Sequence, residues 1–150
     1  MIQPLKERTR FQNEKVTKCY TKFSDLIDEL RSRSLSNDTT TVINKEINLI
    51  NEKPDEKELK KQVRKSQHII IKKLEKEHKI VPKGYYRTTW MAIGMSAFGI
   101  PMGAAFGAAL GNMAMIGMGI PIGMAIGITV GSQKDAQAAK DGRQLNFVWG

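Results

Sequence analysis

Apolar residues recur with a helical period along the first part of the chain. Near the N-terminus the recurring residues are Val16, Tyr20, Phe23, Ile27 and Leu30, and their spacings alternate between four and three. That alternation is typical of a coiled-coil seam on one face of an α-helix. The pattern predicts a helix over residues 5–33, which the turn and capping residues of "SLSNDTT" would end.

Two more amphipathic helices are predicted before the middle of the chain. Residues 41–52 carry the apolar stripe Ile43, Ile47 and Ile50. Residues 55–79 begin after Pro54 with acidic residues, which suits a helix start, and carry Leu59, Val63, Ile70 and Leu74 on one side. Three such helices with short connections predict a small bundle. Because a bundle of this size buries little area, we expect it to self-associate or to dock on a membrane.

The pattern of apolar stripes between charged residues stops at Thr88. No Asp, Glu, Lys or Arg occurs from there to Gln133. A membrane-spanning helix needs about 20 apolar residues, so this run is long enough for two, with a turn near residues 111–118. Basic and aromatic residues common at membrane interfaces stand at its entrance: Tyr85, Tyr86, Arg87 and Trp90. The alternative, two buried helices of a soluble core, is disfavoured because the remaining polar residues would hardly cover so unpatterned a stretch.

An all-α fold class follows from these elements. We expect a cytoplasmic, coiled-coil-like helical domain at residues 1–84, which includes a basic juxtamembrane segment at 60–84. A transmembrane helical hairpin at residues 85–133 and a cytoplasmic tail at 134–150 would follow.

The uncharged run repeats one glycine-rich phrase. "GIPMGAAFGAALG" at residues 99–111 returns as "GIPIGMAIGITVG" at residues 119–131. Residues four apart lie almost above one another on a helix, so each copy places a line of glycines on one face. Helices in lipid associate by close packing at such small residues. The repeat predicts paired glycine zippers made by Gly99, Gly103, Gly107 and Gly111 and by Gly119, Gly123, Gly127 and Gly131.

The two predicted membrane helices differ in their other faces. Alanines at positions 104, 105, 108 and 109 make further faces of the first helix small, whereas the second has two bulky stripes. We therefore infer that the first helix packs on several sides within a homo-oligomer and that the second contacts lipid. Pro101 and Pro121 each remove one backbone hydrogen bond, which predicts a fixed kink, with a hinge as the alternative.

The net charge of +9 is concentrated just before the uncharged run. Residues 60–87 hold ten basic residues against Glu75 and Glu77, and we expect them to lie at an anionic lipid surface; a solvated helix face is the alternative. Because both flanks of the run are basic and its turn is uncharged, both termini should be cytoplasmic. The predicted lipid-surface residues are Lys60, Lys61, Arg64, Lys65, Lys72, Lys73, Lys76, Lys79, Lys83 and Arg87.

Residues that could carry catalysis or bind a metal are sparse. Cys19 is the single cysteine, which excludes an intrachain disulfide and a four-thiolate metal site. His68 and His78 lack a neighbouring ligand pattern, so we expect surface histidines. The uncharged run holds no ionisable residue for a proton or ion relay. We expect no enzymatic activity, no metal and no cofactor.

The doubled "GIPxGxAxGxxxG" phrase, followed by "SQKDAQAAKDGRQL" at residues 132–145, resembles small bacterial glycine-zipper membrane proteins. The likeness covers about residues 85–147. It implies a bacterial inner (plasma) membrane and the close helix packing used by channels and pore-forming toxins.

Two classes of function stay open at this stage. The zippers could assemble an oligomeric membrane complex, as a gated pore or a membrane-disrupting effector that the helical domain controls. Alternatively, the hairpin anchors a scaffold or adaptor whose helical domain binds a cytoplasmic protein or nucleic acid. Nucleic acid is the less favoured partner because no aromatic residues interleave the Lys/Arg run of residues 60–80.

Overall fold

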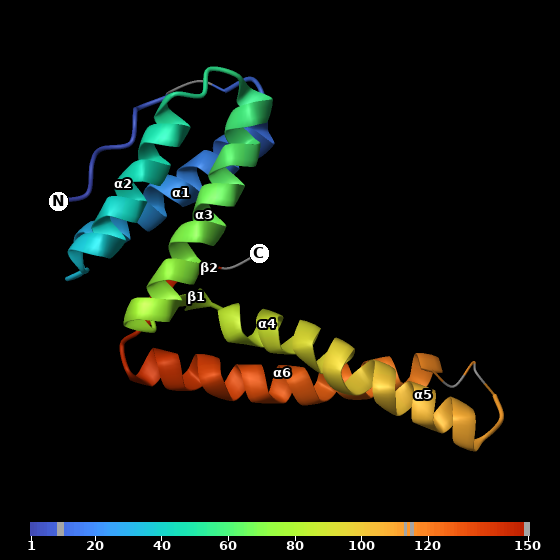
Figure 1. Cartoon of the computed structure of the whole chain (residues 1–150). Coiled ribbons are helices and arrows are strands. Elements are labelled where there is room, and N and C mark those ends of the chain that lie inside the picture. Colours follow the sequence, from blue (N-terminus) through green and yellow to red (C-terminus); the bar gives the residue numbers. More distant parts are fainter. Residues whose placement is uncertain (9–10, 113, 115, 149–150) are drawn as a thin grey trace. The chain divides into compact units, whose positions relative to one another are not determined.

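The computed structural model describes the whole chain except residues 9–10, 113, 115 and 149–150 (Figure 1). It is mostly helical, and its contacts divide the chain into two compact units. The first unit is Met1–Ile80 together with Leu145–Phe147, and the second consists mainly of Val81–Gln144. The first boundary lies near the expected residue 84. The second lies beyond the expected residue 133, and residues of the expected tail belong to the first unit.

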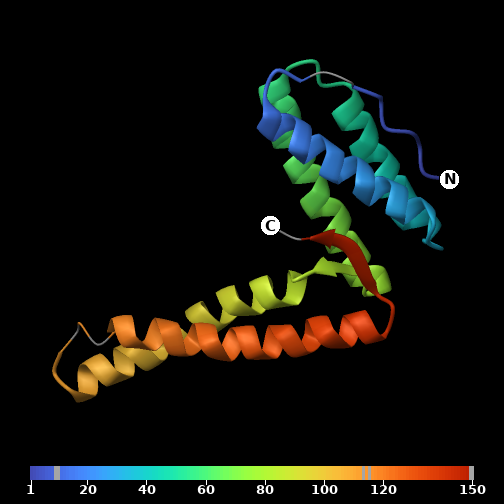
Figure 2. The ribbon, with the colours of Figure 1, turned by 180° about the vertical axis from the view of Figure 1, so that it is seen from behind.

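Three helices form the body of the first unit: α1 (Glu14–Arg31), α2 (Asn37–Asn51) and α3 (Glu56–His78). Each begins at a polar side chain that accepts a hydrogen bond from a backbone N–H of the first turn. These caps are Asn13, Ser36 and Asp55. Helix α3 packs against both α1 and α2, as Figures 1 and 2 show from opposite sides.

The core of the first unit consists of the apolar stripes that the sequence predicted. Every residue of the three stripes is buried, and Leu26 and Ile71 are buried with them. The "HIII" segment therefore contributes to the core through Ile70 and Ile71, while His68 is exposed. The prediction that this part of the chain is mainly helical is confirmed.

The prediction that the first helix starts at residue 5 is wrong. Helix α1 begins at Glu14, and Met1–Arg8 is extended. The backbone N–H groups of Gln12 and Asn13 donate to the carboxylate of Glu56, at 2.7 and 3.2 Å. Because that carboxylate on α3 binds the chain just before the cap, the extended segment is separated from the helix that follows it.

The all-α prediction also needs correction, since two short strands form a two-stranded sheet. They are β1 (Val81–Lys83) and β2 (Gln144–Val148). Pro82 cannot continue a helix. Lys79, with a φ of 56°, ends α3 before β1, and Gly142, with a φ of 66°, follows the last helix before β2. Within the first unit, Leu145 is fully buried and the N–H of Asn146 lies 3.0 Å from both carboxylate oxygens of Glu29.

The second unit is a hairpin of two long helical arms. Its first arm comprises α4 (Tyr85–Gly94), the π-helix η1 (Met95–Gly99) and α5 (Ile100–Ala109). Its second arm is α6 (Ile116–Lys140), which lies alongside the first (Figures 1 and 2). Both arms are long and apolar enough to cross a membrane by length and composition. Helix α6 continues past residue 133 into the segment that was expected to be a tail.

A cluster of polar side chains joins the start of α2 to the end of α3. The carboxylate of Glu77 lies 2.5 Å from the Lys73 ammonium group and accepts hydrogen bonds from Thr39 at 2.5 Å and Ser36 at 3.1 Å. Lys73 also pairs with Asp38. The Lys73 ammonium, followed by the Thr39 hydroxyl, lowers the pKa of Glu77 from 4.5 to about 2. We call these residues the Glu77 cluster.

His78 lies at the same cluster, which the expectation of a surface histidine did not include. Its Nε2 is 3.4 Å from the backbone N of Ser36 and 3.2 Å from the hydroxyl of Thr39. The backbone N–H of Ser36 donates to this nitrogen, so His78 belongs to the contact between the two helices.

We expect the Glu77 cluster to stabilise the fold at neutral pH and to lose this contribution in acid. Because the pKa of Glu77 falls to about 2 in the folded chain, the contribution is complete above about pH 4.5 and disappears as the pH falls toward 2. Circular dichroism of the full chain in detergent would measure the melting temperature of the wild type and of Glu77→Gln across this range. The difference between the two should shrink with falling pH, and a pH-independent difference would contradict the assignment.

Candidate functional site

The glycines of α6 line the contact between the two arms of the hairpin. A Cβ atom added at Gly119, Gly123, Gly127 or Gly131 would lie less than 3.0 Å from backbone atoms of the opposite arm. Ordinary contacts between carbon atoms are about 3.5–4.0 Å. The two backbones therefore approach as closely as glycine alone permits.

The opposite arm meets this line with Gly94, Gly99 and Gly103, and Gly107 is buried as well. Gly94 was not among the predicted packing residues because it stands five residues before Gly99, outside the four-residue repeat. The π-helix η1 supplies the extra residue, with the N–H of Ile100 donating to the carbonyl of Met95. A π-helical turn holds more residues than an α-helical turn, so it keeps Gly94 and Gly99 on one face.

The predicted kink residues have different surroundings. Pro101 is the second residue of α5, whose first residue, Ile100, follows η1, while Pro121 lies inside α6. A proline cannot donate a hydrogen bond to the carbonyl four residues earlier, and its ring crowds that carbonyl. The π-helical turn just before Pro101 is wider than an α-helical turn. The geometry of the first arm therefore already departs from a regular α-helix next to the proline.

Gly111 does not join the glycine line. It has a φ of 62°, and a Cβ added to it would meet no atom within 4 Å. Its N–H donates to the carbonyl of Ala108 at 3.4 Å, and the N–H of Asn112 donates to that of Gly107 at 3.0 Å. These two bonds form a Schellman motif, so the last glycine of the first phrase ends α5. The turn lies between Ala109 and Ile116, close to the predicted place, and its residues 113 and 115 are outside the described part of the chain.

The outer surface of the hairpin is apolar. Along the arms the glycines that line the contact are buried, whereas many large side chains are exposed, as are Ala104, Ala105, Ala108 and Ala109. A pair of helices in water would place its bulky apolar residues in the contact instead. The exposed large residues are Ile93, Phe98, Ile100, Phe106, Leu110, Met118, Ile122 and Ile126.

A buried carboxylate joins the two arms at the open end of the hairpin. Asp135 of α6 is 9% exposed and accepts hydrogen bonds from the backbone N–H groups of Tyr86 at 3.1 Å and Arg87 at 2.9 Å. Helix α4 begins after Gly84, which has no side chain to cap it. Asp135 therefore caps α4 from the other arm. The sequence could not indicate this role, because residue 135 was expected to lie in a tail.

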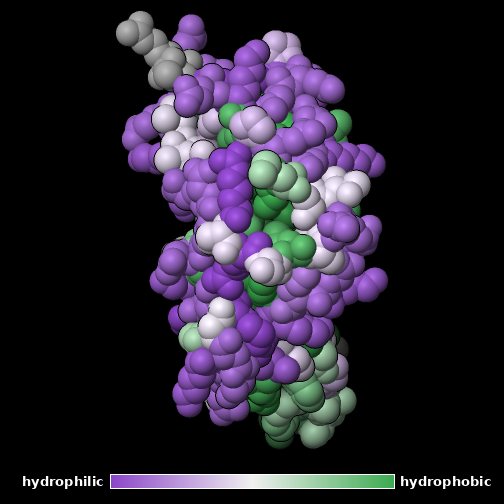
Figure 3. Space-filling model, turned by 90° about the vertical axis from the view of Figure 1, so that its left-hand side faces the viewer, coloured by the Kyte–Doolittle hydropathy of each residue, from purple (hydrophilic) through white to green (hydrophobic). Residues whose placement is uncertain are grey.

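Half of the ten predicted lipid-surface cations lie on or beside one exposed face of α3. Lys61, Lys65, Lys72 and Lys76 are exposed and recur at the spacings of a single helix face, with Arg64 beside them. Lys60 is half-buried, and Lys79 pairs with Glu75 at 3.8 Å. Lys73 is held in the Glu77 cluster, so the structure separates it from the exposed face. Lys83 and Arg87 are exposed in the second unit. Hydrophilic residues also cover most of the face shown in Figure 3.

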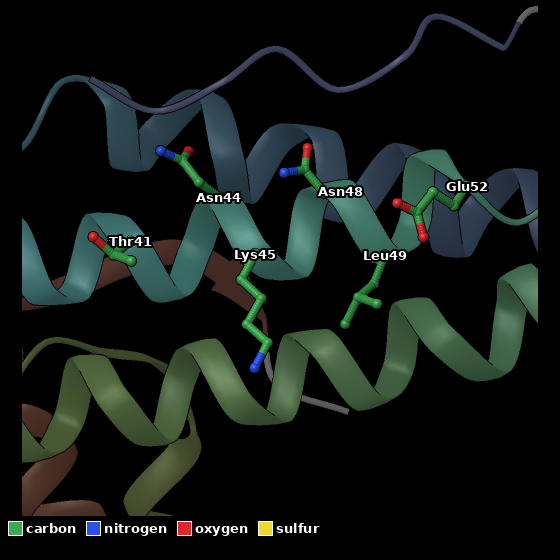
Figure 4. Close-up of a pocket in the computed structure, with 6 residues that line it drawn as sticks. All are labelled: Thr41, Asn44, Lys45, Asn48, Leu49 and Glu52. Atoms are coloured by element: carbon green, nitrogen blue, oxygen red, sulfur yellow. The ribbon is translucent and has the colours of Figure 1, made fainter.

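The residues that the structure describes form no cluster of metal-binding side chains. No three of their His, Cys, Asp or Glu side chains gather closely enough to hold a metal ion. A shallow depression lies along α2 (Figure 4), lined by Thr41, Asn44, Lys45, Asn48, Leu49 and Glu52. In this lining the Asn44 amide already binds the backbone of Gln3 and Met1, and the Thr41 hydroxyl donates to the carbonyl of Asn37. Comparison of the chain with protein-family models, curated proteins and solved structures gives no match.

Two neighbouring glycines of α6 allow a matched test of the backbone contact. Gly119→Ala should destabilise the hairpin by about 1–3 kcal/mol, because its Cβ would overlap the backbone at Gly99 and Gly103. Gly117→Ala should be neutral or stabilising by up to about 1 kcal/mol, since no atom lies within 4 Å of its added Cβ and alanine favours a helix. Unfolding of each purified variant by SDS, followed by Trp fluorescence, measures the difference. Equal effects of the two substitutions would show that the arms do not meet at this line.

Proposed function

We propose that this protein is an integral membrane protein whose helical hairpin anchors the N-terminal helical domain at a membrane surface. The observation that carries the proposal is the construction of the hairpin, with glycine in its contact and large apolar side chains outside. Lipid can surround such an exterior without penalty, whereas water cannot. Residues 88–133 carry no charge that the bilayer would have to accommodate.

The same contact favours an anchor over an oligomeric pore built by the glycines. Gly103 and Gly119 face the other arm of their own chain, so their line is already occupied within one hairpin. The hydroxyls of Ser96 and Thr129 donate to the carbonyls of Ala92 and Ala125 in their own helices, at 3.0 and 2.9 Å. These two polar residues of the uncharged run could have lined a pore, but their hydroxyls are already hydrogen-bonded without water. Any homo-oligomer would use the exposed alanine faces of α5 rather than the glycines.

The connectivity of the two units supports a single-sided topology. Ile80 precedes the hairpin and Leu145 follows it, and both belong to the first unit. A hairpin that leaves and re-enters the same folded unit has both ends on one side of the bilayer. The basic residues flanking the hairpin favour the cytoplasm as that side. The resemblance of the glycine phrase to bacterial membrane proteins supports a bacterial plasma membrane.

Extraction and reporter fusions test this topology. After alkaline carbonate washing, the chain should remain in the membrane pellet, because the hairpin spans the bilayer. Reporters fused to each end should both read cytoplasmic. Release of the chain into the supernatant would remove the membrane proposal, and reporters on opposite sides would replace the hairpin with a single span.

The exposed basic face of α3 gives the anchored domain a second contact with the membrane. Each Lys or Arg near an anionic leaflet contributes about 1 kcal/mol of attraction, and salt screens that attraction. We infer that Lys61, Lys65, Lys72 and Lys76 lie against anionic lipid headgroups when the hairpin is inserted. A protein or nucleic-acid partner at this face would require the same cations to stay accessible in the membrane.

Lysine acylation of the full chain in nanodiscs distinguishes these arrangements. Lys61, Lys65 and Lys72 should react several-fold more slowly in anionic than in neutral nanodiscs, and about 1 M salt should abolish the difference. Lys22, an exposed residue of α1, is the matched control and should react equally in both. If Lys61, Lys65 and Lys72 react at the rate of Lys22 in anionic nanodiscs, the basic face is not on the lipid.

A further inference from the structure

The extended N-terminal segment Met1–Arg8 is bound to α1 and α2 through its own main chain. The carbonyls of Gln3 and Lys6 accept hydrogen bonds from Arg31 at 3.0 Å and from Tyr20 at 2.5 Å. Burial raises the pKa of Tyr20, which keeps its hydroxyl a donor at neutral pH. In Figure 4 the segment runs along the side of α2 toward which Asn44 and Asn48 point.

Two asparagines of α2 bind the segment in the same way. The Asn44 side chain accepts from the N–H of Gln3 at 2.8 Å and donates to the carbonyl of Met1 at 3.2 Å. The Asn51 side chain repeats this arrangement three residues along the segment. It accepts from the N–H of Lys6 at 2.9 Å and donates to the carbonyl of Pro4 at 3.5 Å. Each amide thus contacts the N–H of one residue and the carbonyl two residues before it.

The spacing of the asparagines matches the period of an extended ligand. Asn44 and Asn51 are seven residues apart, about 10.5 Å along one face of a helix. Three residues of polyproline II span about 9.3 Å and complete one turn, which returns the main chain to the same orientation. A flat strand, with its period of two, would present its opposite side at the second asparagine.

The side chains of the segment show the same period of three. Ile2, Leu5 and Arg8 are half-buried, while the residues between them are exposed. Arg8 donates to the carbonyl of Asn51 at 3.1 Å, near the C-terminal end of α2. The segment therefore turns an apolar residue, a second apolar residue three positions later, and an arginine three positions after that toward this surface.

We propose that this surface of α1 and α2 is a binding site for an extended, polyproline-II-like segment of a partner protein, with the pattern apolar-x-x-apolar-x-x-Arg. Residues 1–8 occupy the site in cis and keep it closed until such a segment displaces them. Main-chain hydrogen bonds provide the affinity, and the three inward positions provide the specificity. The proposal goes beyond membrane anchoring and does not depend on it.

Because residues 1–8 of the same chain occupy the site, a partner segment must compete with them to bind. A tethered segment has an effective concentration on the order of millimolar, so a free peptide that binds with a Kd of about 10 μM would bind about a hundredfold more weakly to the closed site. A partner at the membrane surface overcomes this competition by being concentrated there itself.

The test uses the full chain in detergent and a labelled peptide with the sequence of residues 1–8. Ile2→Asp/Leu5→Asp in the protein should release the segment, and we expect the peptide to bind this double variant about a hundredfold more tightly than the unchanged chain. Peptides N-methylated at Gln3 or Lys6 lose one donor each and should bind about five- to tenfold more weakly. Peptides with Gln3→Ala or Lys6→Ala should bind normally, because those side chains are exposed.

Substitutions on α2 provide the matched controls. Asn44→Leu or Asn51→Leu, added to the double variant, should weaken binding about tenfold or more, while Lys45→Leu, at an exposed position that points away from the segment in Figure 4, should not. Failure of the peptide to bind a double variant of unchanged helix content would overturn the proposal, as would equal binding of the N-methylated peptides. Dimers of the unchanged chain that the peptide dissociates would identify the occupant as the segment of a second copy, and would overturn the partner-protein proposal. Because the assay runs in detergent, its failure is distinguishable from a failure of the hairpin to insert in a membrane.

Discussion

The second unit depends on the approach of two backbones at a line of glycines. Once Gly99 and Gly119 bring the arms this close, no side chain fits between them, so the bulky residues of both arms must point outward. The π-helix follows from the same constraint, since the contact continues to Gly94 only if the first arm gains one residue per turn at that point. The apolar exterior, the feature that favours a membrane, is thus a consequence of the contact.

The first unit is stabilised in the opposite way, by large side chains packed inside. It uses polar side chains of its helices to bind segments that lie outside those helices. Glu56 binds the chain before α1, Glu29 binds the strand that returns after the hairpin, and Asn44 and Asn51 bind the N-terminal segment. In each case the side chain belongs to a helix and its partner is a backbone N–H. A backbone donor left without a partner is unfavourable, so these contacts help to determine where the chain outside the helices lies.

One chain contains both arrangements, and the residues that precede and follow the hairpin belong to the same folded unit. Asp135 closes the base of the hairpin by capping α4, and Leu145 is buried in the unit from which Ile80 departs. A membrane anchor with this connectivity presents the helical domain on one side of the bilayer. Of the proposed functions, an adaptor whose bundle binds an extended segment uses the most features of the described structure.

The helices of the bundle and the two apolar arms could be predicted from the sequence, because hydrophobic period and the absence of charge are local properties. The buried stripes from Val16 to Leu74 and the run from Thr88 to Gln133 needed no knowledge of the fold. The partners of the glycines, the stop at Gly111, the role of Asp135 and the strand at Leu145 were decided only by tertiary structure. Each of them depends on a backbone group distant along the chain, or on a φ angle that a pattern of residue types does not record. The same reason applies to Asn44 and Asn51, whose ligand is main chain and leaves no signature in the side chains of residues 1–8 beyond their period of three.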